Sequence, residues 1–312
     1  RQKNMRKLTV ALLSGGKSSE RDISINGGEQ VFKALDKQKY DVIRYDPKFD
    51  LKRLIEDASI IDVALIIMHG LYGEDGTIQG LLDLLNIPYQ GSGVLGSAVA
   101  MNKLASKHLY EKADLSIPPY IKVTRDESVS SDKFIESLGL PFVIKPVKSG
   151  SSIGMSIVKS KEEIKKALDD AFVHDNTVLA EKYIKGIELT CGVIGNHSID
   201  ALPVVEIIPD DEYEFFDFTA KYTKGATSEI CPARIDDTMT EKVQSYAKKA
   251  HTALYCKGYS RTDMILDNKE LYILETNTIP GMTPTSLMPL EAETAGMSYS
   301  QFLDKLIELS IG

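Results

Sequence analysis

Apolar runs and helical patterns alternate along the first part of the chain. Strands are expected at Leu8–Leu13, Tyr40–Tyr45 and Val63–Met68, with helices at about Glu20–Leu35 and Leu51–Asp57. This succession predicts a parallel sheet with crossover helices, and therefore an α/β fold. The loops after the strands, Ser14–Gly16 and His69–Gly70, should then lie along one edge of the sheet, where such proteins bind ligands.

The pattern changes after this first unit. A helix is expected at Ser97–Lys112, and an apolar strand ending near Lys145 precedes a Gly/Ser loop, Ser149–Gly154, and a second strand, Met155–Val158. Strand, short loop and strand is hairpin order, which predicts a second unit of α+β type. A third unit follows from about Lys185. The expected domains are residues 1–94, 95–184 and 185–312.

Near the C-terminus, Arg261 and Asp263 precede a short polar turn, and Glu275 and Asn277 follow it. The apolar runs on both sides of the turn predict a β-hairpin that brings the two carboxylates within a few ångströms. The amide of Asn277 shares a strand face with Glu275. Such oxygens beside an arginine suit Mg²⁺ carrying phosphate. The alternative is a solvated hairpin, but that would not require the backbone-rich turn Thr278–Thr283 that comes next.

Residues Asp210–Glu229 form a long polar segment. Compact domains rarely carry a structureless connection of this length unless it is a lid or a disordered linker. Phe215, Phe216, Phe218 and Tyr222 make the segment too aromatic for a linker. It is therefore predicted to be an active-site lid.

Two loops compete as phosphate-binding sites. Lys145 comes just before the Gly/Ser loop, where its ammonium group can meet nucleotide phosphates while loop amides cover the others; a surface turn is the alternative. The segment Ser14–Ser18 lies between a strand and a helix. The P-loop pattern requires glycine five places before Gly16, but this chain has Ala11 there, so the pattern fails. Glu20 fits either a functional role or the helix dipole. The stretch Leu179–Glu188 is either a purine-binding hinge or a connector.

Composition narrows the class of protein. The chain has 312 residues, a formal charge of −8, 43% hydrophobic residues and 26% charged residues. These values are ordinary for a globular protein of two or three units, and the negative charge disfavours binding to nucleic acid. No apolar run reaches the roughly twenty residues of a membrane span, and Leu8–Leu13 is too short for a signal-peptide core. Cys191, Cys231 and Cys256 show no paired spacing, so reduced thiols and a cytoplasmic location are expected.

Several motifs follow one another along nearly the whole chain. They are His69-Gly70-x-x-Gly73-Glu74-Asp75-Gly76-x-x-Gln79-Gly80, Ile87-Pro88-Tyr89, Met101-x-Lys103, Lys145-Pro146, Gly150-Ser151-Ser152-x-Gly154-Met155, Lys221-Tyr222, Arg261-x-Asp263 and Glu275-x-Asn277-Thr278-x-Pro280-Gly281-Met282-Thr283-x-x-Ser286-Leu287. Together they resemble the D-alanine–D-alanine ligases, a family of the ATP-grasp superfamily. One departure is Asn102, where the family commonly has aspartate before the lysine.

The resemblance implies three α/β domains of the ATP-grasp type, with ATP between the central and C-terminal domains. It implies that ATP phosphorylates the carboxylate of one D-alanine, and that the amine of a second D-alanine then displaces phosphate. The product would be D-alanyl-D-alanine for peptidoglycan precursors. The expected cofactors are ATP and two Mg²⁺ ions, with Mn²⁺ as a substitute. A homodimer without nucleic-acid or membrane partners is expected.

The resemblance also assigns roles to single residues. Those expected to contact ATP are Lys103, Lys145, Ser152, Glu181, Lys182, Ile184, Glu188 and Lys221, and those expected to hold metal are Asp263, Glu275 and Asn277. The expected catalytic and substrate-binding residues are Glu20, His69, Ser151, Tyr222, Arg261, Gly281, Ser286 and Leu287.

Within that set, Glu20 would bind the ammonium of the first substrate, and Arg261 with the Gly281 amide would face the oxyanion of the tetrahedral intermediate. Ser286 and Leu287 would flank the second D-alanine. Glu20, Ser151 and Tyr222 would tie the lid shut, so that water cannot hydrolyse the acyl phosphate.

Two positions bear on the second substrate. Ligases of this kind that make D-alanyl-D-lactate usually carry histidine where this chain has Tyr222. Those that make D-alanyl-D-serine often carry arginine where this chain has Leu287. Both residues here favour D-alanine. A D-serine ligase of the same fold is the alternative, and a nucleotide-binding regulator without catalysis is a third hypothesis. The regulator is disfavoured by Arg261, by the predicted lid and by the intact set of Asp263, Glu275 and Asn277.

Overall fold

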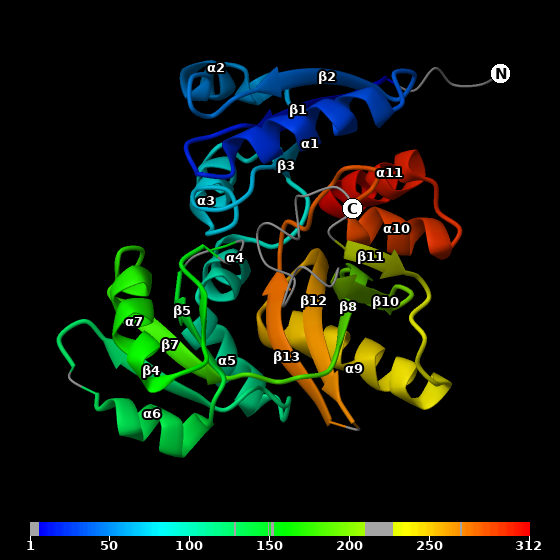
Figure 1. Cartoon of the computed structure of the whole chain (residues 1–312). Helices are drawn as coiled ribbons and strands as arrows, with labels where there is room; N and C mark the ends of the chain where they lie inside the picture. Colours follow the sequence, from blue (N-terminus) through cyan, green and yellow to red (C-terminus); the bar gives the residue numbers. More distant parts are fainter. Residues whose placement is uncertain (1–5, 128, 149, 151–152, 210–226, 269) are drawn as a thin grey trace.

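The computed structural model describes residues 6–127, 129–148, 150, 153–209, 227–268 and 270–312. Their strands form three sheets, which follow one another along the chain from blue through green to orange in Figure 1. The first sheet is parallel and the other two are antiparallel. The α/β class is therefore confirmed. Within the described residues, no helix is long and apolar enough to cross a membrane.

The first sheet has the strand order β2-β1-β3. Its elements are β1 (Leu8–Ser14), α1 (Arg21–Ala34), β2 (Tyr40–Tyr45), α2 (Leu51–Glu56), the 3-10 helix η1 (Ala58–Ile60), β3 (Val63–Ile67) and α3 (Thr77–Leu84). Every residue of β3 is buried, in keeping with its uninterrupted apolar sequence. Because β1 and β3 are parallel neighbours, the loops that follow them meet at one edge, as the sequence predicts.

The second sheet has the order β4-β7-β5-β6. Its elements are β4 (Tyr120–Thr124), α6 (Ser131–Leu138), β5 (Phe142–Pro146), β6 (Ser156–Val158), the 3-10 helix η2 (Lys161–Glu163), α7 (Ile164–Phe172) and β7 (Thr177–Lys182). The predicted hairpin order is confirmed, because β5 and β6 pair antiparallel. The rings of Phe134 and Phe142 stack at 5.8 Å in the core of this unit.

The third sheet has the order β11-β10-β8-β12-β13, with β9 beside β8. Its strands are β8 (Ile187–Gly195), β9 (Asp200–Ala201), β10 (Val205–Pro209), β11 (Thr227–Ile230), β12 (Gly258–Asp267) and β13 (Glu270–Asn277). The helices of this part of the chain are α9 (Asp237–Ala253), α10 (Leu287–Thr294) and α11 (Tyr299–Ile311). Strand β12 lies between β8 and β13 and pairs antiparallel with both.

The single helix predicted over Ser97–Lys112 is wrong in one respect. The structure has two helices, α4 (Val94–Met101) and α5 (Lys103–Lys112), which are separated at Asn102. The backbone of Asn102 is extended, and its side-chain oxygen accepts a hydrogen bond from the Ala105 amide at 3.0 Å. This is an N-cap, a position that asparagine favours over a helix interior and that the family's aspartate would fill equally well.

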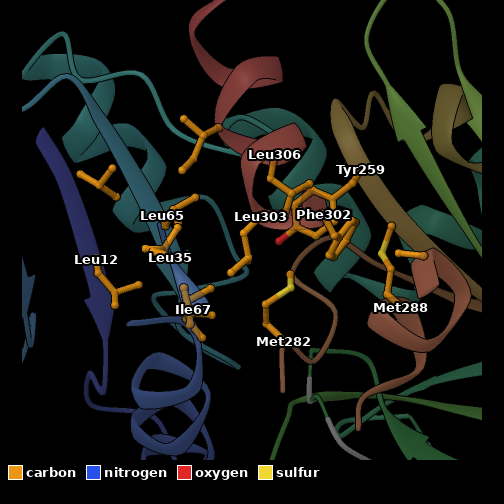
Figure 2. Close-up of a cluster of buried hydrophobic side chains, with 14 of the residues drawn as sticks. Leu12, Leu35, Leu65, Ile67, Tyr259, Met282, Met288, Phe302, Leu303 and Leu306 are labelled. Carbon is orange, nitrogen blue, oxygen red and sulfur yellow. The ribbon is translucent and has the colours of Figure 1, made fainter. Parts of the chain in front are cut away.

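One hydrophobic cluster is shared by the two ends of the chain (Figure 2). Leu12 and Leu65 from the first sheet pack in the same cluster as Phe302 and Leu306 of α11, together with Tyr259 of β12. All five side chains are at most 1% exposed. The shared core fixes the edge of the first sheet relative to the β12–β13 hairpin.

Candidate active site

The predicted hairpin is formed by β12 and β13. Asp263 stands directly opposite Glu275, and Arg261 opposite Asn277. The register shifts immediately after Asp263, where Leu274 has no partner in β12. Such a bulge bends a strand and changes the direction of its side chains, and it is common beside active sites. The hairpin thus places its polar residues at one end, next to the turn that contains Gly281.

Described residues donate at least four hydrogen bonds to Asp263. Arg261 donates two of them, from Nε and Nη2, each at 2.9 Å. The Thr190 hydroxyl donates at 2.6 Å and the Asn277 amide at 3.1 Å. Although burial lowers the pKa of Arg261, the Asp263 carboxylate outweighs it and raises that pKa, so the guanidinium is always charged. The carboxylate and the guanidinium are therefore held in one fixed geometry.

Helix α5 is fastened to the same hairpin by side chains on one of its faces. The Lys103 ammonium lies 3.6 Å from Oε2 of Glu275. The Tyr110 hydroxyl donates to Oγ1 of Thr276 at 2.7 Å. The helix therefore holds a lysine beside the carboxylate that the sequence assigns to metal binding.

The hairpin offers hard oxygen donors for a divalent cation. Within the described residues, no three His, Cys, Asp or Glu side chains are grouped so as to hold a metal. Asp263 and Glu275 supply two carboxylates, and Asn277 adds an amide oxygen. This set fits Mg²⁺ if phosphate oxygens and water complete the coordination shell, which is the usual arrangement for this ion.

Apart from Lys103 on α5, the described nucleotide-binding residues predicted from the sequence lie on β5, on β7, in the connection to β8 and at the start of β8. The Lys145 ammonium lies 2.7 Å from Oε2 of Glu181, and both side chains are buried. Lys182 ends β7, Ile184 is 7% exposed, and Glu188 is the second residue of β8. The connection thus joins the second sheet to the third.

Glu20 lies between two loops. A Cβ atom at Gly70 would fall 2.6 Å from its Oε2, and one at Gly150 would fall 3.5 Å from the same atom. Gly70 has φ +74°, so glycine is required there both for backbone conformation and for space. Glu20 is 3% exposed and lies close to both Gly70 and Gly150.

Two further titratable groups accompany Glu20. His69 is buried, and burial lowers its pKa to about 4, so its imidazole is neutral at pH 7. Burial and repulsion from Glu20 raise the pKa of Glu74 to about 8, and this carboxyl accepts a hydrogen bond from the Gly70 amide at 2.6 Å. No role for Glu74 was predicted from the sequence. An ammonium group bound here would relieve the repulsion between the two carboxyl groups.

The predicted acceptor residues lie at the start of α10. The Ser286 hydroxyl oxygen accepts from the Thr283 amide at 3.1 Å, and a Cβ at Gly281 would lie only 2.9 Å from it. Leu287 is 8% exposed and packs with Val205 and Ile207. The turn is therefore compact, and Leu287 presents little of its surface.

Sequence reasoning also missed Glu291, on α10. Its side chain is fully buried, and its Oε2 accepts a hydrogen bond from the Gly192 amide at 2.9 Å. Gly192 pairs with Arg261 in the sheet, so this contact joins α10 to the part of the sheet that carries Arg261. Burial raises the pKa of Glu291 well above its usual value. The carboxyl therefore keeps its proton at pH values at which an exposed glutamate has lost it.

A prediction follows for the pH dependence of stability. Native Glu291 keeps its proton where the unfolded chain has lost it, so the free energy of unfolding should fall as pH rises above about 4.3. Glu291→Gln is neutral at every pH and should remove this fall. The melting temperature of the variant minus that of the unsubstituted protein should therefore increase as the pH is raised from about 5 to about 8. Glu293→Gln, at an exposed position of the same helix, is the control and should not show this increase. A melting-temperature difference for Glu291→Gln that stays constant across this pH range would contradict the prediction.

Four predicted residues, Ser151, Ser152, Lys221 and Tyr222, lie outside the described residues, as does most of the predicted lid. The three cysteines are described, and all are free thiols, as expected.

The two antiparallel sheets are joined by the segment from Glu181 to Glu188 and are both contacted by α5. Lysines lie on one sheet and paired carboxylates on the other, which agrees with the ATP-grasp class of enzymes expected from the resemblance. Residues 109–308 match the family model described as D-ala D-ala ligase C-terminus, and residues 46–92 match D-ala D-ala ligase N-terminus. The chain belongs to the D-alanine–D-alanine ligase family.

Individual proteins agree with this assignment. A D-alanine–D-alanine ligase from Syntrophobacter fumaroxidans is 60% identical over 305 residues, which cover 98% of both chains. The structure of D-alanine–D-alanine ligase from Bacillus anthracis complexed with ATP has a TM-score of 0.85 at 36% identity and covers 97% of both chains. The VanG D-Ala:D-Ser ligase from Enterococcus faecalis has a TM-score of 0.83 at 33% identity, covering 98% of this chain and 100% of its own.

Proposed function

We propose that the protein joins two D-alanine molecules into D-alanyl-D-alanine at the expense of ATP, for peptidoglycan precursor synthesis in the cytoplasm. The observation that carries the proposal is the fixed pair of Arg261 and Asp263, opposite Asn277 and Glu275. The test is phosphate release from ATP with a panel of D- and L-amino acids. Phosphate release that requires D-alanine supports the proposal. Phosphate release at the same rate with any amino acid, or with none, contradicts it.

In the first step, a carboxylate oxygen of one D-alanine attacks the γ-phosphorus of ATP, and ADP leaves. Phosphoryl transfer asks the protein chiefly for position and charge. Lys103 and Lys145 supply cations for the phosphates, and Glu20 receives the ammonium group of the first D-alanine. Two Mg²⁺ ions, held by Asp263, Glu275 and Asn277, would neutralise charge on the phosphate oxygens.

In the second step, the amine of the other D-alanine attacks the acyl carbon. Phosphate leaves, and the amine gives up a proton. Arg261 and the Gly281 amide face the oxygen that becomes negative in this step, which is the role usually most costly to lose. The raised pKa of Arg261 supports it, because the guanidinium stays charged at every working pH.

Several finer statements belong to the same proposal. ATP is expected between residues 95–184 and 185–312, and a homodimer is the expected assembly. Tyr222, Lys221 and Ser151 would close the lid over the acyl phosphate, and Ser152 would contact ATP. Lid closure would exclude the water that otherwise hydrolyses this intermediate.

The acceptor pocket should prefer D-alanine. Leu287 brings no cation to the pocket, and its largely buried side chain gives D-serine no polar partner. A small apolar pocket discriminates weakly against an added hydroxyl, by roughly a hundredfold at most. Equimolar D-alanine and D-serine should therefore give mainly D-alanyl-D-alanine, with some D-alanyl-D-serine, when dipeptides are separated by mass. D-Lactate should be nearly inert at neutral pH. A dominant D-serine product would favour the alternative, a D-serine ligase of the same fold.

A further inference from the structure

Lys107 is a buried cation without a part in the steps described above. It lies in α5, one turn after Lys103, and its side chain is 1% exposed. Its ammonium nitrogen lies 3.0 Å from Oε1 of Glu181, while Oε2 of the same carboxylate lies 2.7 Å from the ammonium of Lys145. One carboxylate is therefore shared between two ammonium groups. Together the three side chains carry one positive charge in excess.

The contact between Lys107 and Glu181 is an attraction between charges more than a hydrogen bond. Among the described residues, neither Lys107 Nζ nor Glu181 Oε1 has a hydrogen-bond partner of good geometry. The ammonium also lies 5.1 Å from the centre of the Tyr120 ring, an arrangement that attracts a cation. The acidic Glu111, further along α5, is exposed, so water screens its effect.

Glu181 is ionised in this arrangement. Burial raises its pKa, but the attraction of Lys107 and then of Lys145 outweighs burial, and the net direction is downward. Burial lowers the pKa of Lys107, and the Glu181 carboxylate opposes that shift. Both lysines therefore act on this carboxylate, and the charge attraction of Lys107 is the largest of the causes that lower its pKa.

A fold selected for stability alone would not need the second lysine. Glu181 and Lys145 would form a neutral pair, whereas a buried charge in excess is costly. The excess is useful if an anion arrives to compensate it. Lys145 is the one such an anion would meet, because its side chain is 11% exposed and that of Lys107 is 1% exposed.

We propose that Lys107 is a positioning residue for nucleotide binding, which shares the charge of Glu181 so that Lys145 keeps its attraction for a nucleotide phosphate. This inference rests on the proposed function, which places ATP against Lys145. Without Lys107, the whole carboxylate charge would fall on Lys145 and weaken its hold on phosphate.

The test compares ligands with and without phosphate. In the full chain, Lys107→Met should weaken ADP binding, measured by calorimetry, by about tenfold or more and change adenosine binding by less than about twofold. The melting temperature of the ligand-free variant should be equal to or above that of the unsubstituted protein, because an excess buried charge is gone. A purely structural lysine would lower the melting temperature and weaken both ligands alike, and that result would overturn the inference.

Two further variants complete the test. Lys112→Met, at an exposed position of the same helix, should leave both affinities unchanged. Adding Lys107→Met to Lys145→Met should cause no further loss of ADP binding, since Lys107 acts through Lys145. If Lys107→Met does not fold, Lys107→Gln enters the same comparison. If the single variant Lys107→Met binds ADP normally, this inference is overturned but the proposed function is not. If the unsubstituted protein binds no ADP, the proposed function is overturned as well.

Discussion

Replacing Glu275 with glutamine should reduce turnover by about a hundredfold or more, the usual effect of losing one preorganised charge at a reacting phosphate. The amide keeps the size of the side chain but removes the charge that faces Asp263 across the hairpin and Lys103 at 3.6 Å. The side chain is 27% exposed, so the fold should tolerate the change. Steady-state phosphate release at saturating ATP and D-alanine measures the effect.

Glu270→Gln is the matched control, because Glu270 begins the same strand, is exposed and lies far from the paired carboxylates along it. That variant should have normal turnover. Asp263→Asn should also lose turnover, but it should unfold more easily, since its buried partner Arg261 loses an ionised carboxylate. Near-normal turnover of Glu275→Gln at saturating Mg²⁺ would remove Glu275 from the metal site.

Arg261→Lys should lower kcat by about a hundredfold to a thousandfold, although the positive charge is kept. Lysine cannot reproduce the two parallel hydrogen bonds from Nε and Nη2 to Asp263, so its ammonium would not hold the same place opposite the oxyanion. Stability should change less than activity, because a cation still accompanies the buried carboxylate. Comparison of kcat with the thermal midpoint separates the two effects.

Arg234→Lys provides the comparison. The Arg234 guanidinium also donates two hydrogen bonds to a carboxylate, that of Glu206, but it is largely exposed and no catalytic role is proposed for it. The Arg234→Lys substitution should leave kcat unchanged. This result would show that loss of a bidentate arginine–carboxylate contact does not by itself abolish activity. Equal loss of kcat in both variants would contradict the role of Arg261.

The hairpin shows what the sequence predicts well. Asp263 and Glu275 are twelve positions apart and joined by a short turn, so local patterning alone determines that they meet. The strands of the first sheet follow for the same reason, since they are short, mostly apolar runs separated by helical patterns. The break at Asn102 was missed because a helix pattern continues on both sides of it, and only the capping bond reveals the interruption.

Contacts between distant segments could not be predicted in this way. Glu291 meets Gly192 across 99 positions, and Lys107 reaches Glu181 from another element. Both are residues of ionisable type in helices, for which the default expectation is a solvated side chain. Their burial depends on which elements pack together, and no spacing in the sequence records that. The lysine spacing of four between Lys103 and Lys107 was the one available signal.

The core shared by the two ends of the chain has a consequence for biosynthesis. During translation, β1 and β3 leave the ribosome long before α11 is made, so the face that carries Leu12 and Leu65 is covered only in part, by α1, while most of the polypeptide is synthesised. Phe302 and Leu306 then close that face in the last step of assembly. Nascent chains stalled before α11 should therefore recruit holding chaperones and be cut readily by proteases, even though their first sheet has all its strands.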